Sequence, residues 1–237
     1  MTDQSQIGHS REGLAEQSRS RGEETAGNTR SRMSPDEREK MILEKAVHFF
    51  AKHGFNAQMR QLAKAIGVSQ GLIYRYFKSK DELIERVYQH NFLTRWTLAW
   101  CETLQDRTRP LDVRLKEFYR DYLAVVDDYE WIRIAMYSGL SGNNLTRRYV
   151  EEQVGSLLRV IATECRTDGV GDPTRVRSPD EIDIELAWHL HSTIIYYLIR
   201  KHILGTKVAS DHDSLVEMMV DNFLNGLRAP PVARTLP

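Results

Sequence analysis

Residues 60–83 read RQLAKAIGVSQGLIYRYFKSKDEL, and this stretch decides the fold. Residues 58–66 carry apolar side chains at helical spacing, and Gly67 then suits the left-handed turn that ends a helix. Ser69 can cap a second short helix over residues 70–77. Two short helices joined at a glycine have helix-turn-helix geometry. The residues expected to pack the pair onto a core are Met59, Leu62, Ala63, Ile66, Val68 and Ile73.

Capping residues mark the helices on either side of this motif. Ser34 and Pro35, with Glu37 three residues after the serine, predict the start of a helix that continues to Gly54. Ser79 and Glu82 form a second capping box, which opens a long helix. The motif is therefore the second half of a three-helix unit, and a longer helix follows it.

Only helical patterns follow, so the sequence predicts an all-α fold with no strands. Breaks are expected at Pro110, from Gly139 to Gly142 and from Gly169 to Pro173, and Ser178 repeats the capping pattern of Ser34. The expected domains are a disordered basic and polar tail (1–33), a helix-turn-helix domain (34–80), a helical body (81–228) and a frayed tail (229–237). The expected helices of the body are 80–105, 111–127, 130–139, 145–167, 180–203 and 212–227.

Charge is unevenly distributed along a chain whose formal net charge is zero. Residues 45–86 hold eight basic and three acidic side chains, whereas residues 91–237 hold 18 basic and 21 acidic ones. A locally basic segment in a neutral protein favours a polyanion as its partner. The remainder of the chain is expected to serve another purpose.

Several classes of protein are disfavoured by what the sequence lacks. The longest apolar run, residues 194–199, is too short to cross a membrane, and no apolar signal region begins the chain. Cys101 and Cys165 cannot form a disulfide framework, and a small apolar role is favoured over redox sensing. His189 and His191 do not share a helix face, so no metal site is expected. The missing signal region and the two cysteines favour the cytoplasm as the location of the protein. The sequence has no phosphate loop and no nucleophile elbow, so we expect that the protein is not an enzyme and needs no cofactor.

The segment from Arg60 to Leu83 resembles the TetR family of regulators. The shared pattern is an alanine before Gly67-Val68-Ser69, then Tyr74 and Phe77, then Lys80 at the start of a long helix. The end of the preceding helix, residues 49–55, is similar as well. This sequence is one residue shorter than the common pattern between Gly54 and Arg60, where Asn56 is expected to replace the usual cap of the second helix.

The resemblance implies that the second helix of the motif enters the major groove of double-stranded DNA. Gln70 and Gly71 would then lie at base edges, because glutamine can bond adenine with two hydrogen bonds and glycine admits close backbone approach. Tyr74 and Lys80 resemble the family's phosphate contacts. The further expected DNA contacts are Arg60, Ser69, Arg75 and Tyr76. The arginines of the N-terminal tail could also reach DNA, although a tail without a role is favoured.

The resemblance also implies a regulatory body that binds a small-molecule effector and forms a homodimer. Nine of the chain's 21 aromatic residues lie within residues 91–140, which suits an apolar pocket and equally suits an ordinary core. Helices 180–203 and 212–227 are the expected dimer interface, since the first is apolar on more than one face. The expected pocket residues are Trp96, Trp100, Tyr122, Trp131 and Tyr137.

These observations predict a repressor that binds a palindromic operator as a homodimer and leaves it when an effector binds. Two alternatives remain at this point. The first is a ligand-independent DNA-binding protein of the same fold that acts in chromosome organisation or division. The second is an enzyme, for which the sequence offers no catalytic motif.

Overall fold

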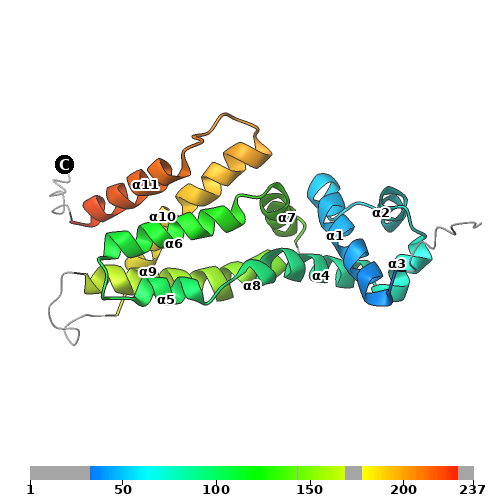
Figure 1. Ribbon diagram of the computed structural model, residues 1–237, viewed down its shortest axis with the longest axis horizontal. Coiled ribbons are helices and arrows are strands. Elements are labelled where there is room, and N and C mark those ends of the chain that lie inside the picture. Colours follow the sequence, from blue (N-terminus) through cyan, green and yellow to red (C-terminus); the bar gives the residue numbers. More distant parts are fainter. Residues whose placement is uncertain (1–32, 143, 169–177, 229–237) are drawn as a thin grey trace, which may run out of the picture. The chain divides into compact units, whose positions relative to one another are not determined.

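The structure, a computed structural model, describes residues 33–142, 144–168 and 178–228, in which the regular elements are helices and no strand occurs. The all-α prediction is confirmed. The chain divides into two compact units, Met1–Ser34 and Pro35–Pro237, and all the described helices lie in the second. The predicted tails and the predicted break from Gly169 to Pro173 fall largely or wholly outside the described residues. The helices in chain order (Figure 1) are α1 (Pro35–His53), α2 (Met59–Ile66), α3 (Gln70–Tyr76), α4 (Lys80–Phe92), η1 (Leu93–Arg95), α5 (Ala99–Gln105), α6 (Leu111–Val126), α7 (Tyr129–Leu140), α8 (Leu145–Tyr149), η2 (Val150–Val154), α9 (Gly155–Thr167), α10 (Glu181–Leu198), η4 (Ile199–Ile203) and α11 (His212–Arg228).

The first three helices pack around a shared apolar core, as the sequence predicts. Gly67 adopts φ +76° and ends α2, and the backbone N–H of Val68 donates to the carbonyl of Ala63. The hydroxyl of Ser69 accepts from the backbone N–H of Leu72 at 3.1 Å and so caps α3. Ile73 is fully buried in the apolar core and holds α3 beside α2. We call residues 35–79 the head and residues 80–228 the body. Whether residue 80 is a true domain boundary stays a prediction, because α1 also packs on α4 and α7 of the same compact unit.

Three helix starts differ in detail from the sequence-based expectation. Gln58, and not Asn56, is the N-cap of α2, where the side-chain oxygen of Gln61 accepts from its backbone N–H at 2.9 Å. Asp180, and not Ser178, caps α10, because its carboxylate accepts from the backbone N–H of Asp183. At α4 the hydroxyl of Ser79 is the cap, but the Glu82 carboxylate reaches back to the N–H of Lys78. The helices themselves begin within one residue of their predicted positions.

The predicted single helix over residues 80–105 is wrong, because it breaks between Phe92 and Ala99. A 3₁₀ turn follows α4, and Trp96 then takes an extended backbone with ψ 135°. Side-chain hydrogen bonds compete with the helical ladder at this point. The hydroxyl of Thr94 donates to the carbonyl of His90 at 2.5 Å, and that of Thr97 accepts from the backbone N–H of Ala99 at 3.2 Å.

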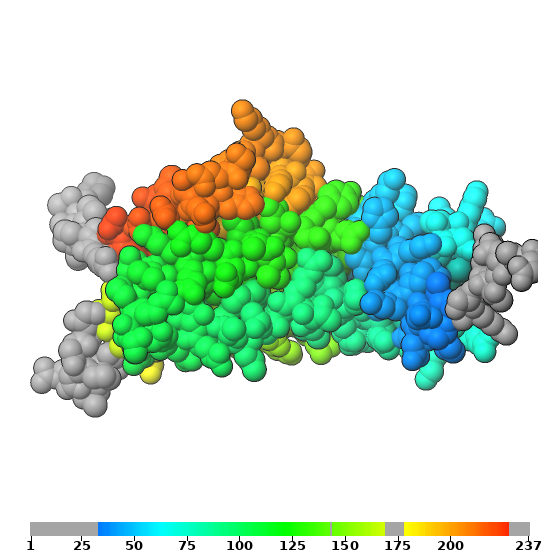
Figure 2. All heavy atoms as spheres, in the orientation of Figure 1, coloured from blue at the N-terminus to red at the C-terminus, as the bar shows by residue number. Residues whose placement is uncertain are grey.

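The body is a set of helices packed pairwise around a continuous apolar core. α6 packs against α11 and α9 against α10, and the atoms of α6 and α11 form a continuous surface in Figure 2. The predicted helix 145–167 is continuous through the π-helical turn η2, and the predicted helix 180–203 ends in another, η4. No helix in the described ranges is long and apolar enough to cross a membrane.

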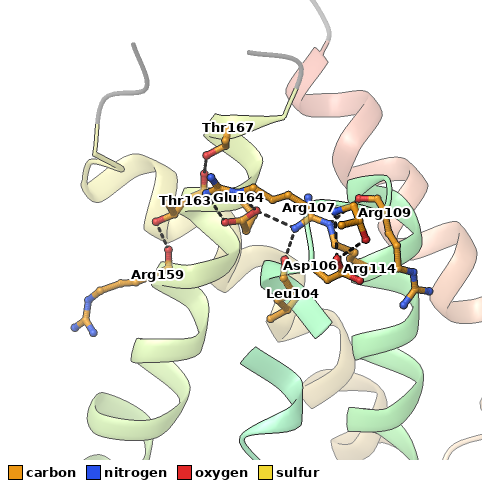
Figure 3. Close-up of polar contacts among 10 residues, drawn as sticks. Leu104, Asp106, Arg107, Arg109, Arg114, Arg159, Thr163, Glu164 and Thr167 are labelled. Carbon is orange, nitrogen blue, oxygen red and sulfur yellow. Dashed lines mark hydrogen bonds and ion pairs between the residues drawn. The ribbon is translucent and has the colours of Figure 1, made fainter. Parts of the chain in front are cut away.

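A buried ion-pair network joins α5, α6 and α9 (Figure 3). Arg107 and Arg114 both donate to the Glu164 carboxylate, at 2.8–3.0 Å, and Arg114 also donates to the carbonyls of Leu104 and Arg109. Burial disfavours the charged carboxylate, but the bonds from the two arginines outweigh this and hold the pKa of Glu164 below its ordinary value. The network therefore buries the charged Glu164 carboxylate inside the body between two arginine side chains.

Candidate nucleic-acid interface and internal cavity

Helix α3 presents its polar residues to solvent while Ile73 holds it from behind. Gln70, Gly71, Tyr74 and Arg75 are all exposed. A Cβ added at Gly71 would meet nothing within 4 Å, so the backbone there is open to close approach. This is the surface that a recognition helix presents to a groove.

The other predicted contacts frame this surface from neighbouring helices. Arg60 is exposed on α2, and Lys80 is half-buried in the first turn of α4. Arg60, Arg75 and Lys80 form no ion pair with another described residue. Their charges are therefore available to an external anion, whereas Tyr76 is half-buried and packs against the core.

The body contains a cavity of about 160 Å³ among α4, α6, α7, α8, η2 and α10. Tyr122 and Trp131, two of the five predicted pocket residues, line it. On its wall the hydroxyl of Tyr122 lies 3.4 Å from Nε2 of His191. The full lining is Phe92, Tyr122, Trp131, Ile132, Ala135, Met136, Thr146, Tyr149, Val150, Val154, Trp188, His191 and Ile195.

The other three predicted pocket residues lie elsewhere. Trp96 and Trp100 pack edge-on against one another, with ring centroids 5.2 Å apart, and contact the rings of Tyr149 and Tyr122 that face the cavity. Tyr137 lies at the contact between α1 and α7, where its ring would be 3.1 Å from a Cβ at Gly54. Which residues touch an effector stays a prediction.

The cavity is also lined by Tyr149, Trp188 and His191, which the sequence analysis did not predict as pocket residues. The first two fall outside the aromatic-rich stretch 91–140, and the histidine was weighed only as a metal ligand. The available signal was helical spacing, since Trp188, His191 and Ile195 are separated by three and four residues and share one face of α10.

A second hollow, an open groove of about 580 Å³, runs between α10 and α11. Leu190 and Met219 form part of its floor, and Met218 on its wall is 58% exposed. Ile182, in the first turn of α10, is 67% exposed. The two helices predicted to form a dimer interface thus leave apolar side chains uncovered within one chain. The groove is lined by Leu186, His189, Leu190, Thr193, Leu215, Met218, Met219, Asn222, Phe223, Gly226 and Leu227.

The remaining cysteine and histidine side chains show no sign of metal chemistry in the described ranges. No group of three or more potential ligands lies together there. Cys101 and Cys165 are both free thiols. Burial raises the pKa of Cys165 to about 12, which keeps it protonated and unreactive.

Sequence comparison places the head among bacterial regulators. Residues 42–87 match the family described as bacterial regulatory proteins, tetR family. The HTH-type transcriptional repressor Rv1474c of Mycobacterium tuberculosis is 32% identical over 100 residues, which cover 40% of this chain and 46% of that protein. The uncharacterized HTH-type transcriptional regulator YuxN of Bacillus subtilis is 41% identical over 49 residues, which cover 20% of this chain and 17% of that protein. The chain thus spans less than half the length of these relatives. Both are named as regulators, which agrees with the expectation that the chain is not an enzyme.

Solved structures extend the likeness to the body. A TetR-like transcriptional regulator from Rhodococcus sp. RHA1 has a TM-score of 0.63 at 19% identity, covering 82% of this chain and all of that one. The fatty acid degradation regulator FadR from Bacillus halodurans has a TM-score of 0.59 at 21% identity, covering 84% of this chain and all of that one. Residues 42–87 thus match the tetR family of bacterial regulatory proteins, and the fold of the chain is similar to that of TetR-like regulators.

Proposed function

We propose that the protein is a transcriptional repressor that binds a palindromic operator as a homodimer and is released from it by a small-molecule effector. The observation that carries the proposal is the exposed polar face of α3, held by a buried Ile73 and flanked by unpaired cations. The repressor role is further supported by the name of the Mycobacterium tuberculosis relative. Such a protein would act in the cytoplasm, on the nucleoid.

The contacts divide into those that position the protein and those that distinguish sequences. Gln70 and Gly71 face the base edges, where the glutamine amide can bond adenine through two hydrogen bonds. Tyr74, Arg75 and Lys80 contact phosphates. Ser69 and Arg60 add phosphate contacts at the ends of the surface, while Tyr76 contributes mainly by packing α3 in place.

The dimer forms through α10 and α11. Apolar side chains uncovered in one chain, among them Ile182 and Met218, are buried when a second copy covers the groove between these helices. A two-fold arrangement presents two α3 helices to half-sites one helical turn apart, roughly 34 Å.

Release follows from the position of α7, which contacts both the cavity and the head. Trp131 and Ala135 line the cavity. Arg133, on the same helix, donates to the carbonyl of Ala51 in α1 at 2.6 Å. An effector that occupies the cavity shifts α7, and α1 moves with it, which changes the spacing of the α3 helices.

The test is capture of sheared genomic DNA by the purified full-length protein and by a Tyr74→Ala, Lys80→Ala double variant. Enrichment of a few palindromic sites, lost in the double variant, is expected. Lys40→Ala is the matched control, because Lys40 is an exposed lysine on α1 that is not among the proposed contacts. Loss of Lys80 alone should lower the slope of log K against log salt by about one.

Three other outcomes would contradict the proposal. Many scattered sites would indicate a protein that organises the chromosome. Equal loss in the Lys40→Ala control would indicate nonspecific electrostatic binding. No preference for genomic sites over random duplex at low salt would show that α3 does not read sequence.

A further inference from the structure

The cavity in the body has a lining without charge. Its 13 lining residues include no acidic side chain, no lysine and no arginine. His191 is the one basic side chain among them, and burial lowers its pKa to about 4, so it is neutral at physiological pH. Because an ion would lose its hydration here without gaining a counter-charge, the cavity disfavours charged ligands.

Two buried polar atoms on residues of the cavity wall have no hydrogen-bond partner among the described residues. They are the indole Nε1 of Trp131 and Nδ1 of His191, on side chains that are 3% and 2% exposed. Leaving such atoms unbonded costs about 1–3 kcal/mol each, so buried groups of this kind are usually satisfied. The Thr146 hydroxyl on the same wall, in contrast, donates to the carbonyl of Ala135.

Ring-bearing side chains dominate the wall. Phe92 lies 5.1 Å from the ring of Trp131 and 5.2 Å from that of Tyr149, measured between centroids, and Tyr122 and Trp188 add two more rings. A flat aromatic ligand can make offset or edge-to-face contacts with several of them at once. At about 160 Å³ the cavity is close in size to an engineered cavity of about 150 Å³ that holds benzene.

We propose that this cavity binds a small uncharged aromatic molecule carrying a hydroxyl group, of the phenol or aromatic alcohol class. The ring fills the space between the aromatic side chains. The hydroxyl oxygen accepts from Trp131 Nε1, and the hydroxyl completes the hydrogen bonding of His191, whichever ring nitrogen carries the proton. This inference rests on the proposed function, because it names the effector class that the body recognises.

Calorimetric titration of the full-length protein with three probes tests the ligand class. Phenol is the hydroxylated probe, toluene has a ring of similar size without a hydroxyl, and benzoate carries a charge. We expect phenol to bind at least as tightly as toluene and benzoate not to bind. Toluene binding more than tenfold tighter than phenol, or benzoate binding as well as phenol, would overturn the inference.

Two variants assign the binding to this cavity. Trp131→Phe keeps a ring and removes the donor, so phenol affinity should fall about fivefold to tenfold while toluene affinity stays unchanged. Tyr129→Phe is the matched control, since Tyr129 is 42% exposed and does not line the cavity, and should leave both affinities unchanged. Ala135→Phe fills the cavity and should abolish binding of both probes. An equal effect of Trp131→Phe on phenol and toluene would overturn the hydrogen-bond assignment.

A DNA-binding assay on the same samples separates the two proposals. Protein that binds its genomic sites but none of the probes contradicts the ligand class and leaves the repressor function intact. Protein that binds phenol in the predicted manner but no specific DNA contradicts the repressor function and supports the cavity assignment. Cooperative thermal unfolding of Ala135→Phe, as for the wild-type protein, shows that this variant is folded, whether or not the filled cavity itself releases DNA.

Discussion

The head and the body treat polar side chains in opposite ways. In the described part of the chain, every buried polar or charged side chain lies beyond residue 90. The head buries apolar residues and keeps its polar side chains at least partly in solvent. The buried polar residues of the body are Asn91, Arg114, Ser138, Glu164, Asp183 and His191.

This difference matches what each region has to bind. A polyanion is bound at a surface, where cations that are unpaired and hydrated can exchange water for phosphate. A small neutral molecule is bound in the cavity of the body, where buried polar atoms can form hydrogen bonds with it. Substitutions on α3 should therefore change DNA binding and leave stability nearly constant, whereas substitutions at buried polar groups of the body should change stability first.

The largest effect is expected at the buried ion-pair network. Glu164→Ala leaves Arg114, which is 4% exposed, without its carboxylate. Removing one partner of a buried pair destabilises by about 3–5 kcal/mol, because the other charge stays buried and uncompensated. Urea denaturation at a fixed protein concentration measures the change.

Glu217→Ala is the matched control, since Glu217 pairs with Arg120 at 2.9 Å on the surface. Its loss should cost less than about 1 kcal/mol. Equal losses of unfolding free energy in the two variants would mean that the buried Glu164 network stabilises the protein no more than a surface ion pair does. The contrast between head and body would then have no basis in stability.

A smaller effect is expected from His191 as pH falls. Burial lowers the pKa of His191 to about 4. The groups that face it are the hydroxyl of Tyr122, the ring of Tyr119 and the ring of Trp188. Burial raises the pKa of both tyrosines, so neither is charged.

The sign follows from which state binds the proton. Below pH 6.5 the unfolded histidine takes up a proton that folded His191 takes up only near pH 4, so stability falls across that window. The loss should reach about 2 kcal/mol between pH 6.5 and pH 5. It is measured as the difference in unfolding free energy between the wild-type protein and His191→Gln at each pH. His53→Gln, at an exposed histidine in the last turn of α1, is the control. A constant difference between wild type and His191→Gln from pH 7.5 to 5 would contradict a buried neutral histidine.

The same contrast explains what could be predicted from the sequence. The geometry of the head could be predicted, because it depends on residues that are neighbours along the chain. Gly67 needs a positive φ, the Ser69 hydroxyl caps the helix three residues ahead, and Ile73 packs against the core one turn later. The lining of the cavity could be predicted only in part, because it is formed by residues from helices that lie far apart in the sequence. Aromatic density drew attention to Tyr122 and Trp131, which line the cavity, but could not indicate that Tyr137 faces α1.

The break after α4 depends on local hydrogen bonds that periodicity conceals and on packing against distant helices. Residues 80–105 keep an apolar spacing that suits one helix, yet Thr94 and Thr97 bond the nearby backbone and interrupt the ladder. Threonine side chains can form such hydrogen bonds both within a continuous helix and at a point where a helix ends. Only the packing of Trp96 and Trp100 against Tyr149 and Tyr122 settles which occurs.

The smallest effect is expected where the two regions meet. Arg133 on α7 donates to the carbonyl of Ala51 and, at 2.9 Å, to the hydroxyl of Tyr137, and its guanidinium lies over the rings of Tyr129 and Tyr137. Tyr137→Phe removes one hydrogen bond and keeps the ring against Gly54. The expected loss of stability is about 0.5–1.5 kcal/mol.

Tyr129→Phe is the control for that variant, because Tyr129 also contacts Arg133 through its ring but is 42% exposed. If Arg133 holds α7 to α1, Tyr137→Phe should leave operator affinity without effector nearly unchanged and weaken the release of DNA by a ligand in the cavity. Fluorescence anisotropy of labelled operator, with and without phenol, measures both. If Tyr137→Phe and Tyr129→Phe release DNA equally, the hydroxyl bond does not couple cavity to head. The coupling would then run through other contacts between the two regions, such as the packing of α4 and α7 on α1.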